Sequence, residues 1–470
     1  MDDTKSKHHG HDQDLTQGPI LKQLWSLAWP MMLSVFFYTL YNIVDAYWVS
    51  KLSAEAIAAV SISQISLFVM ISLGFGITVG SGVIMAMHIG AKNMVEDERI
   101  LGQSFVLSAI LGAFFTVVAL VFRHQLLAMS GASGLIYQPA SEYFTIIAAG
   151  SILLFIMMAI MFAFNSQGDT STLTKLFAIS TLINVVLDPI MIFGWAGFPA
   201  WGISGAAVAT LVSQAVFIVL ALRSLSSAYR HIRFRFYNLT FKWASVKKVL
   251  DIGFPAALTQ IIFPIGLALL TLIISQGFFE AGTVAFSLGF RIEFFAYLPA
   301  VGFGFGAMAM IGQNMGAGNP TRAKAAFRQA LLYAFIGAAA LGVLAALFSG
   351  PIVRAFTDDP TVTAYVRSYM WTVSLSYGFL SAMMVEAPAF QAIGRSWPGF
   401  WIFFLRVMVV TLPLSYVFTH ILSMPIGSIW AAIIAGNVVS AVVGYIWITR
   451  AMSKINAKLP PAAVEAQPDF

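Results

Sequence analysis

Long apolar runs, each ended by a short polar break, repeat along almost the whole chain. A membrane-spanning helix needs about 20 mostly apolar residues. Twelve runs meet this length, at roughly 24–48, 56–87, 100–122, 142–164, 172–194, 202–222, 249–275, 282–312, 326–348, 366–388, 397–421 and 427–449. None alternates polar and apolar residues as a membrane β-strand does. The pattern therefore predicts an all-α integral membrane protein with twelve transmembrane helices.

The composition supports this prediction and excludes several classes of protein. Of the 470 residues, 59% are hydrophobic and only 10% are charged, whereas a soluble domain carries about 25% charge. A soluble enzyme and a nucleic-acid-binding protein are therefore not expected, although the pI is near 9.4. The chain has no cysteine, which excludes disulfides and thiol catalysis.

Lys and Arg gather on one side of the predicted membrane. Of the 26, 20 lie on the side of both termini, four lie on the opposite side, and Arg291 and Arg406 lie inside apolar runs. Cytoplasmic loops carry an excess of positive charge, so we expect both termini in the cytoplasm. The polar start of the chain shows no signal peptide, and we assign no role to its three histidines, His8, His9 and His11.

The two halves of the chain share short motifs at a spacing of 226 residues. The Gly-Ala-x-Asn loop that starts at Gly90 recurs at Gly316, and the pair Gly76/Gly80 recurs as Gly302/Gly306. Two further matches are Ala163-Phe164 with Ala389-Phe390 and, one residue out of register, Ala28-Trp-Pro30 with Gly253-Phe-Pro255. The chain is therefore a duplicated six-helix unit. We expect the paired glycines to allow close helix packing rather than to contact a substrate.

An even number of helices returns each copy to its starting side, so the copies are parallel repeats. Such repeats are related by a pseudo-two-fold axis along the membrane normal and are found in transporters. The predicted parts are a disordered cytoplasmic tail (1–20), an N-terminal bundle (21–222), a basic linker (223–248), a C-terminal bundle (249–450) and a cytoplasmic tail (451–470).

Two acidic residues lie inside predicted spans of the first half. A charge at bilayer depth costs several kcal/mol unless it is paired or hydrated, so Asp45 and Asp188 are functional candidates. Asn184 lies four residues before Asp188 and shares its helix face, and Pro189 frees a backbone carbonyl in the preceding turn. Amide, carboxylate and carbonyl oxygens are ligands that suit Na⁺ or a proton.

The Thr210 hydroxyl in the next span is a further candidate ligand of this cation site. The positions that correspond to Asn184 and Asp188 in the second half are Val410 and Leu414, so the polar pair is present in one copy only. Two alternatives stay open. In the first, Asp188 has a structural role and caps a helix junction at the membrane edge. In the second, Asp45 lies near the outer end of its span and is hydrated there.

Charges inside the second half form a second rank of candidates. Arg291 and Glu293 lie two residues apart, and we expect an ion pair or a structural hydrogen-bond cluster there rather than a substrate site. Glu386 has no partner in the sequence and is a candidate cation contact. Arg406 is expected near a cytoplasmic helix end or paired with a carbonyl.

Motifs for an ATP-driven or hydrolytic protein are absent from the sequence. No lysine follows a glycine, so the chain has no Walker A loop, and it has neither H-E-x-x-H nor G-x-S-x-G. The remaining energy source for a transporter is an ion gradient. We therefore expect no enzymatic activity and no cofactor other than H⁺ or Na⁺ as a coupling ion.

Together these features resemble the multidrug and toxic compound extrusion (MATE) transporters over about residues 20–452. The resemblance rests on the two parallel copies, on Pro30 placed fifteen residues before Asp45, on the Asn184/Asp188 pair and on the repeated Gly-Ala-x-Asn loops. It implies two bundles in a V that open alternately to each side. It also implies export of organic cations and lipophilic drugs in exchange for H⁺ or Na⁺, with Pro30 as a hinge.

Within the family the chain resembles the prokaryotic DinF-like branch. That likeness implies a cation site at Asp45, Asn184, Asp188 and Thr210, with Tyr41, Asp45 and Asp188 in contact with substrate. The sister NorM branch has an acid early in span 7, where this chain has none between Pro255 and Phe263. The resemblance also implies a multi-pass protein of the bacterial cytoplasmic (inner) membrane, and we expect a monomer in contact with lipid.

Two other functions compete with drug export. A lipid-linked saccharide flippase of the same superfamily would need further spans or a cationic cavity for pyrophosphate, and this chain has only Arg291 and Arg406 at depth. A non-transporting scaffold or sensor would need soluble domains, whereas the longest stretch between spans is about 26 residues. Multidrug antiport is therefore the preferred hypothesis.

Overall fold

The structure, a computed structural model, describes residues 14–226, 234–239, 241–354 and 356–458. Within these ranges the chain is almost entirely helical and has no strand. The helices of the first half are α1 (Ile20–Ser50), α2 (Ala54–Gly90), α3 (Met94–Val121), α4 (Arg123–Met129), α5 (Tyr137–Ala149), α6 (Ser151–Ser166), α7 (Thr170–Phe193) and α8 (Gly202–Leu225). Those of the second half are α9 (Trp243–Gly316), α10 (Pro320–Leu347), α11 (Ser349–Arg354), α12 (Pro360–Thr372), α13 (Tyr377–Ala392), α14 (Trp397–Phe404), α15 (Leu412–Tyr416) and α16 (Gly427–Lys458).

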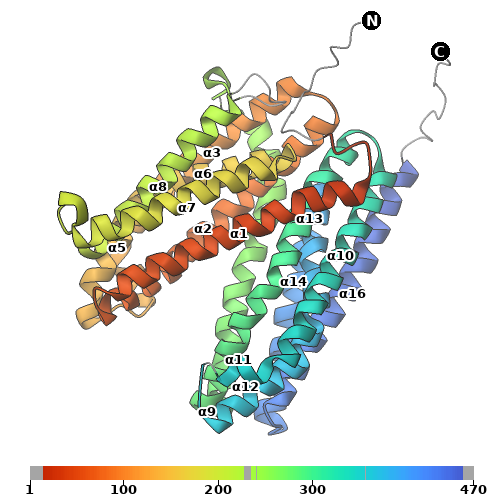
Figure 1. The fold of residues 1–470 in the computed structure, drawn as a ribbon. Coiled ribbons are helices and arrows are strands. Elements are labelled where there is room, and N and C mark those ends of the chain that lie inside the picture. Colours follow the sequence, from red (N-terminus) through yellow and green to blue (C-terminus); the bar gives the residue numbers. More distant parts are fainter. Residues whose placement is uncertain (1–13, 227–233, 240, 355, 459–470) are drawn as a thin grey trace, which may run out of the picture.

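Some membrane spans are made of more than one of these helices, and one helix supplies two spans. Among the described residues, ten helices are long and apolar enough to cross a membrane, or eleven if α5 and α6, bent by 52°, form one span. Helix α9 leaves the helical conformation at Phe279 (φ 54°, ψ −151°) and turns back there (Figure 1), which adds the twelfth. The prediction of twelve transmembrane helices is confirmed.

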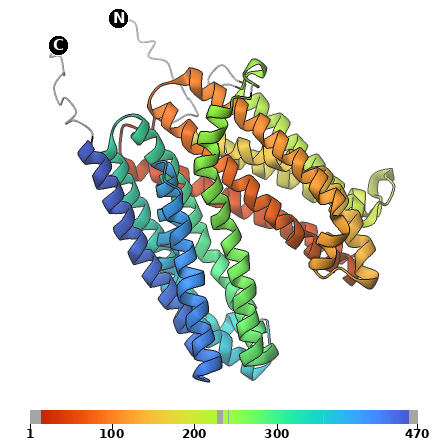
Figure 2. The ribbon, with the colours of Figure 1, turned by 180° about the vertical axis from the view of Figure 1, so that it is seen from behind.

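The helices form two bundles, α1–α8 and α9–α16, which meet at the end that carries both termini and diverge toward the other end (Figures 1 and 2). Helix α1 packs against α7 of its own bundle and also against α9 and α10 of the other. We call the end at which the bundles meet the terminal face.

Glycine contacts at the terminal face show how the two copies are related. Gly90 ends α2 and lies so close to the Gln313 backbone on α9 that a Cβ would overlap the Gln313 carbonyl oxygen. Gly316 has the same relation to the Met87 carbonyl oxygen. Each contact maps onto the other when 226 is added, so the pseudo-two-fold axis passes between them. These glycines are needed because the backbones touch.

The other paired glycines also pack helices together. Gly76 of α2 lies against Gly253 at the start of α9, and Gly302 of α9 lies against the Ala28 carbonyl of α1. These two contacts again correspond through the repeat. Because helices without side chains between them approach closely, the expected packing role of these positions agrees with the structure.

Residues 14–19, the described part of the segment before α1, pack against the second bundle, whereas the expectation for 1–20 is a disordered tail. Leu15 is fully buried, its backbone N–H donates to Gln313 Oε1 (3.3 Å), and its carbonyl accepts from Asn314 Nδ2 (3.0 Å). The Arg322 guanidinium donates to the carbonyls of Gln17 (2.9 Å) and Gly18 (2.8 Å). Second-bundle side chains therefore satisfy the backbone of this short segment, which composition alone did not reveal.

Some predicted parts lie outside the described residues. These are the histidines at positions 8, 9 and 11, most of the C-terminal tail and residues 227–233 of the linker. The remainder of the linker is partly helical, since α8 continues to Leu225 and α9 begins at Trp243.

Candidate functional site

Helix α7 carries a polar pair at the centre of the first bundle. Asn184 and Asp188 lie one turn apart and are fully buried, and Asn184 Nδ2 donates to Asp188 Oδ1 (3.0 Å). The other oxygen of each side chain, Asn184 Oδ1 and Asp188 Oδ2, accepts no hydrogen bond from the described residues. Leaving a buried oxygen unsatisfied costs about 1–3 kcal/mol, so the pair is poised to accept a cation or a proton.

Asp45 of α1 belongs to the same site. It is 3% exposed, and its Oδ1 atom also has no hydrogen-bond partner among the described residues. Its charge acts on Asp188, so the two carboxyl groups share one environment. Two like charges brought together out of water favour a bound cation or proton between them. The low exposure of Asp45 argues against the alternative of a hydrated side chain at the end of its span.

The hydroxyl groups of the site link α1 to α8. Tyr41, one turn before Asp45, donates its phenolic hydrogen to Thr210 Oγ1 (2.7 Å). Thr210 is buried, and the charges of Asp45 and Asp188 also act on the Tyr41 hydroxyl. The structure therefore brings together all five residues predicted for the first-bundle site.

Tyr143 on α5 is a further member of this site, and the sequence did not single it out. Its side chain is 4% exposed, and its hydroxyl lies within reach of the charges of Asp45 and Asp188. One tyrosine in a helix with many apolar residues has no spacing that marks it. Only the packing of α5 against the rest of the bundle places it here.

The chemistry of the cluster is that of oxygen ligands. It holds two carboxyl groups, one amide oxygen and the hydroxyls of Tyr41, Tyr143 and Thr210, with no Lys, Arg or His among them. Hard oxygen donors suit Na⁺ and H⁺ better than soft transition metals. In the part of the chain that the structure describes, no group of three or more His, Cys, Asp or Glu forms a metal centre.

Pro30 lies inside α1, and threonines of α7 cover the break in its hydrogen bonding. Proline lacks a backbone N–H, so the carbonyl of Ser26 loses its helical donor. Thr170 Oγ1 donates to that carbonyl (3.4 Å), and Thr174 Oγ1 lies 2.6 Å from the carbonyl oxygen of Pro30. The predicted hinge is therefore attached to α7, four turns before the Asn184/Asp188 pair.

In the second bundle, Glu293 is buried but Arg291 is not beside it. Tyr369 of α12 donates a hydrogen bond to Glu293 Oε2, whereas the Arg291 side chain is exposed. The expected ion pair between Arg291 and Glu293 is wrong, because residues two apart on a helix point to different faces. The expected hydrogen-bond cluster is present, with Tyr369 as its partner.

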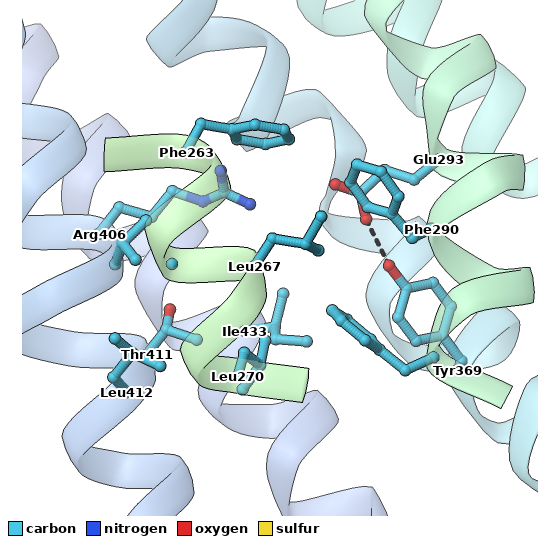
Figure 3. A pocket seen from close by; sticks show the side chains of 13 residues that line it. Phe263, Leu267, Leu270, Phe290, Glu293, Tyr369, Arg406, Thr411, Leu412 and Ile433 are labelled. Atoms are coloured by element: carbon cyan, nitrogen blue, oxygen red, sulfur yellow. Dashed lines mark hydrogen bonds between the residues drawn. The ribbon is translucent and has the colours of Figure 1, made fainter. Parts of the chain in front are cut away.

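Arg406 is the base that faces Glu293. It is 8% exposed and lies in a π-helical turn (η5, Leu405–Thr411). Its Nε atom donates to Asn437 Oδ1 (2.7 Å), and Asn437 Nδ2 donates to Ser376 Oγ (2.8 Å). Of the two expectations for Arg406, the carbonyl partner agrees with the structure. Figure 3 shows the guanidinium pointing toward Glu293 across a small cavity of about 50 Å³.

Glu386 stands apart from both clusters. It is fully buried on α13, and neither carboxyl oxygen has a hydrogen-bond partner among the described residues. A Cβ at Gly444 of α16 would overlap Glu386 Oε2, so the glycine provides the space that the carboxyl group occupies. Glu386 does not line the cavity between Glu293 and Arg406.

Comparison with known proteins agrees with the duplicated fold. The MatE family model matches residues 30–190 and again residues 255–417. An FAD transporter of Shewanella oneidensis is 27% identical over 87% of this chain and 90% of that protein. A probable multidrug resistance protein NorM of Thermotoga maritima is 26% identical over 88% of this chain and 89% of its own length.

Solved structures give the same result. An outward-facing conformation of a multidrug resistance MATE family transporter superposes with a TM-score of 0.88 and is 25% identical, covering 97% of this chain and all of the other. A transporter of the MOP superfamily from Pyrococcus furiosus, described as having a binding pocket of reverse polarity, has the same TM-score. The family is one of transporters rather than enzymes. The chain therefore belongs to the MatE family, the multidrug and toxic compound extrusion (MATE) transporters.

Proposed function

We propose that this protein is an antiporter that exports lipophilic organic cations in exchange for H⁺ or Na⁺. The observation that carries the proposal is a set of three buried oxygens that have no hydrogen-bond partner among the described residues, in a cluster with no basic side chain: Asp45 Oδ1, Asn184 Oδ1 and Asp188 Oδ2. Relatives named as multidrug resistance proteins support the class of cargo.

The mechanism is competition for one set of oxygens. A cationic drug and a coupling ion both neutralise Asp45 and Asp188, so binding of one weakens binding of the other. Entry of H⁺ or Na⁺ removes the charge that attracts the drug and releases it. Tyr41 and Tyr143 supply aromatic faces beside the carboxyl groups, which suit a flat cationic cargo.

The conformational step uses the two ends of the V. The terminal face is the cytoplasmic side of the inner membrane, and the bundles alternate between opening there and opening at the opposite end. Pro30 lets α1 bend when the carboxyl groups are neutralised, because a proline removes one hydrogen bond from its helix. Separating the bundles at the terminal face requires the Gly90–Gln313 and Gly316–Met87 contacts to break.

Transport in proteoliposomes tests this assignment. Ethidium efflux is measured with a proton gradient and a sodium gradient imposed separately, for the wild type and for Asp188→Asn, with Arg291→Gln as a control at an exposed position. We expect Asp188→Asn to lose gradient-driven efflux while its elution profile and helicity in detergent stay unchanged. Full gradient-driven efflux by that variant would refute the coupling site.

A nucleotide cargo is the second candidate function. A relative over most of the chain is named an FAD transporter, and the buried Arg406 guanidinium supplies donors that suit a phosphate. Parallel efflux assays with ethidium and FAD distinguish the two when each rate is divided by the amount of folded protein, since Arg406→Gln should then reduce FAD transport only. A lipid-linked saccharide flippase has less support, because Arg291 is exposed and leaves Arg406 as the buried base.

A further inference from the structure

A basic pocket lies at the terminal face, away from both clusters. It has a volume of about 560 Å³ and lies between the first two turns of α3 and described residues of the segment that joins the bundles. Its polar lining comes from Glu98, Arg99, Arg235, Tyr237, Asn238 and Lys242. Neither the proposed drug site nor the cavity at Arg406 uses any of these residues.

One wall of the pocket is built by residues 234–239 of the joining segment, which pack closely on α3. A Cβ at Gly102 would overlap the Asn238 carbonyl oxygen, so the backbone of the segment touches the helix. The rings of Phe105 and Phe234 pack edge to face with centroids 5.0 Å apart. Phe234 and Asn238 are buried. Arg235, which lies between these two residues and pairs with Glu98, is therefore held in place.

The lining of the pocket is positively charged. Three basic side chains face one acid, Glu98, which pairs with Arg235 (3.1 Å). Arg99 pairs with Glu96 outside the pocket (3.0 Å), and Lys242 forms no ion pair with a described residue. The excess positive charge in the pocket favours the binding of an anion. Arginine N–H groups match the oxygens of a phosphate in geometry as well as in charge.

Exposed apolar side chains surround the pocket on the same face. Tyr237 is 68% exposed, Phe241 53%, Trp243 64% and Val95 65%. Val95 and Trp243 lie in the first turns of the spans in α3 and α9. Aromatic residues at the ends of spans lie at the level of the lipid headgroups. The pocket is therefore at the depth of phosphate groups and beside a surface that acyl chains cover.

We propose that this pocket binds the phosphate headgroup of an anionic phospholipid of the cytoplasmic leaflet. Arg235, held over the Tyr237 ring at 5.7 Å, and Lys242 contact the phosphate, and the acyl chains lie along Val95 and Trp243. Basic pockets on the cytoplasmic side of membrane proteins suit anionic headgroups. The inference rests on the orientation given under the proposed function, but it does not depend on the drug site.

Native mass spectrometry of the full-length protein tests the proposal. Retention of phosphatidylglycerol is compared with that of phosphatidylcholine for the wild type and for the double variant Arg235→Gln/Lys242→Gln. We expect retention of phosphatidylglycerol to fall on the order of tenfold in the variant and retention of phosphatidylcholine to stay unchanged. Lys247→Gln/Lys248→Gln, in the same basic stretch but outside the pocket lining, is the matched control.

Each other outcome overturns the proposal. Equal losses in the control variant would mean that general surface charge holds the lipid. Equal retention of both lipids by the wild type would mean that the pocket does not select an anionic headgroup. Displacement of the lipid by millimolar inorganic phosphate would identify a site for a free anion instead. Asp188→Asn should retain the lipid normally, so failure of the drug site and failure of the lipid site are separable.

Discussion

The two bundles share a backbone plan, but the polar groups at their centres differ in charge. In the first bundle, Asp45 and Asp188 lie together among neutral oxygens. In the second, the acid Glu293 faces the base Arg406, and each has its own hydrogen-bond partner. Duplication has therefore preserved the packing and not the chemistry.

The reason lies in what constrains each position. Gly90 and Gly316 meet the opposite copy, so a side chain at either would separate both bundles. The polar sites face the inside of one bundle, so only the contacts and the ligand of that bundle constrain them. The first site leaves oxygens that a cation would satisfy, whereas the second balances its own charge. We expect coupling to depend on the first and stability on the second.

The largest expected effect concerns ion coupling by the acidic site of the first bundle. Asp188→Asn should lower gradient-driven drug efflux by about a hundredfold, because the variant cannot alternate between a charged and a neutral state. Glu293→Gln, the matched change in the second bundle, should retain most of the coupling. The measurement is efflux from vesicles with an imposed gradient. Loss of coupling in Glu293→Gln with normal coupling in Asp188→Asn would show that the second bundle, and not the first, holds the coupling site.

The second prediction tests the balanced charge of the second bundle, through stability rather than transport. Arg406→Met removes the base that faces Glu293 and leaves Asn437 Oδ1 without its donor, so it should destabilise the protein by about 3 kcal/mol. Thermal unfolding in detergent measures this loss. Arg291→Met, at an exposed position, should change stability by less than about 0.5 kcal/mol. Equal effects of the two variants would contradict the burial of Arg406.

The third prediction tests the part that both copies share. Gly90→Ala and Gly316→Ala should each weaken the closed terminal face by about 1–3 kcal/mol, because the added methyl overlaps a backbone carbonyl. Distances between spin labels placed on α2 and α10 measure the opening. The two variants should behave alike because the contacts are related by the pseudo-two-fold axis. A response to only one of them would show that the symmetry does not extend to the energetics.

The smallest effect concerns the two prolines that the repeat aligns. Thr174 of α7 bonds the Pro30 carbonyl across helices, whereas Thr259 bonds the Pro255 carbonyl within its own helix (2.9 Å). Thr174→Val should therefore weaken the interaction between α1 and α7 by about 1 kcal/mol and change the rate of drug export. Thr259→Val should leave the rate unchanged. A hinge role for Pro30 would be contradicted if the two valine variants transport alike.

The fold was predictable because its main signals lie along the chain. The length of each apolar run and the 226-residue repeat predicted twelve spans in two copies, and the structure has both. The packing of the described residues before α1 was not predictable in this way. Residues 14–19 form a short segment with one large apolar residue, Leu15, and their position depends on Gln313, Asn314 and Arg322, about 300 residues away.

The two candidate sites differ in how much of each could be predicted from the sequence. Asp45, Asn184 and Asp188 stood out because buried polar groups are costly and therefore rare in apolar runs. Tyr143 did not stand out, since a tyrosine is common in such a run. The nearness of Arg291 and Glu293 in the sequence predicts a pair, although a helix places the two side chains on different faces.

The sequence by itself therefore determined the number of spans, the duplication and the identity of the buried acids, because hydrophobic length and the cost of a charge are properties of single segments. The tertiary structure decided which groups meet. It placed Asp45 with Asp188, Arg406 rather than Arg291 opposite Glu293, and the N-terminal segment against the second bundle. Such contacts depend on how each helix is rotated and packed, which no single segment records.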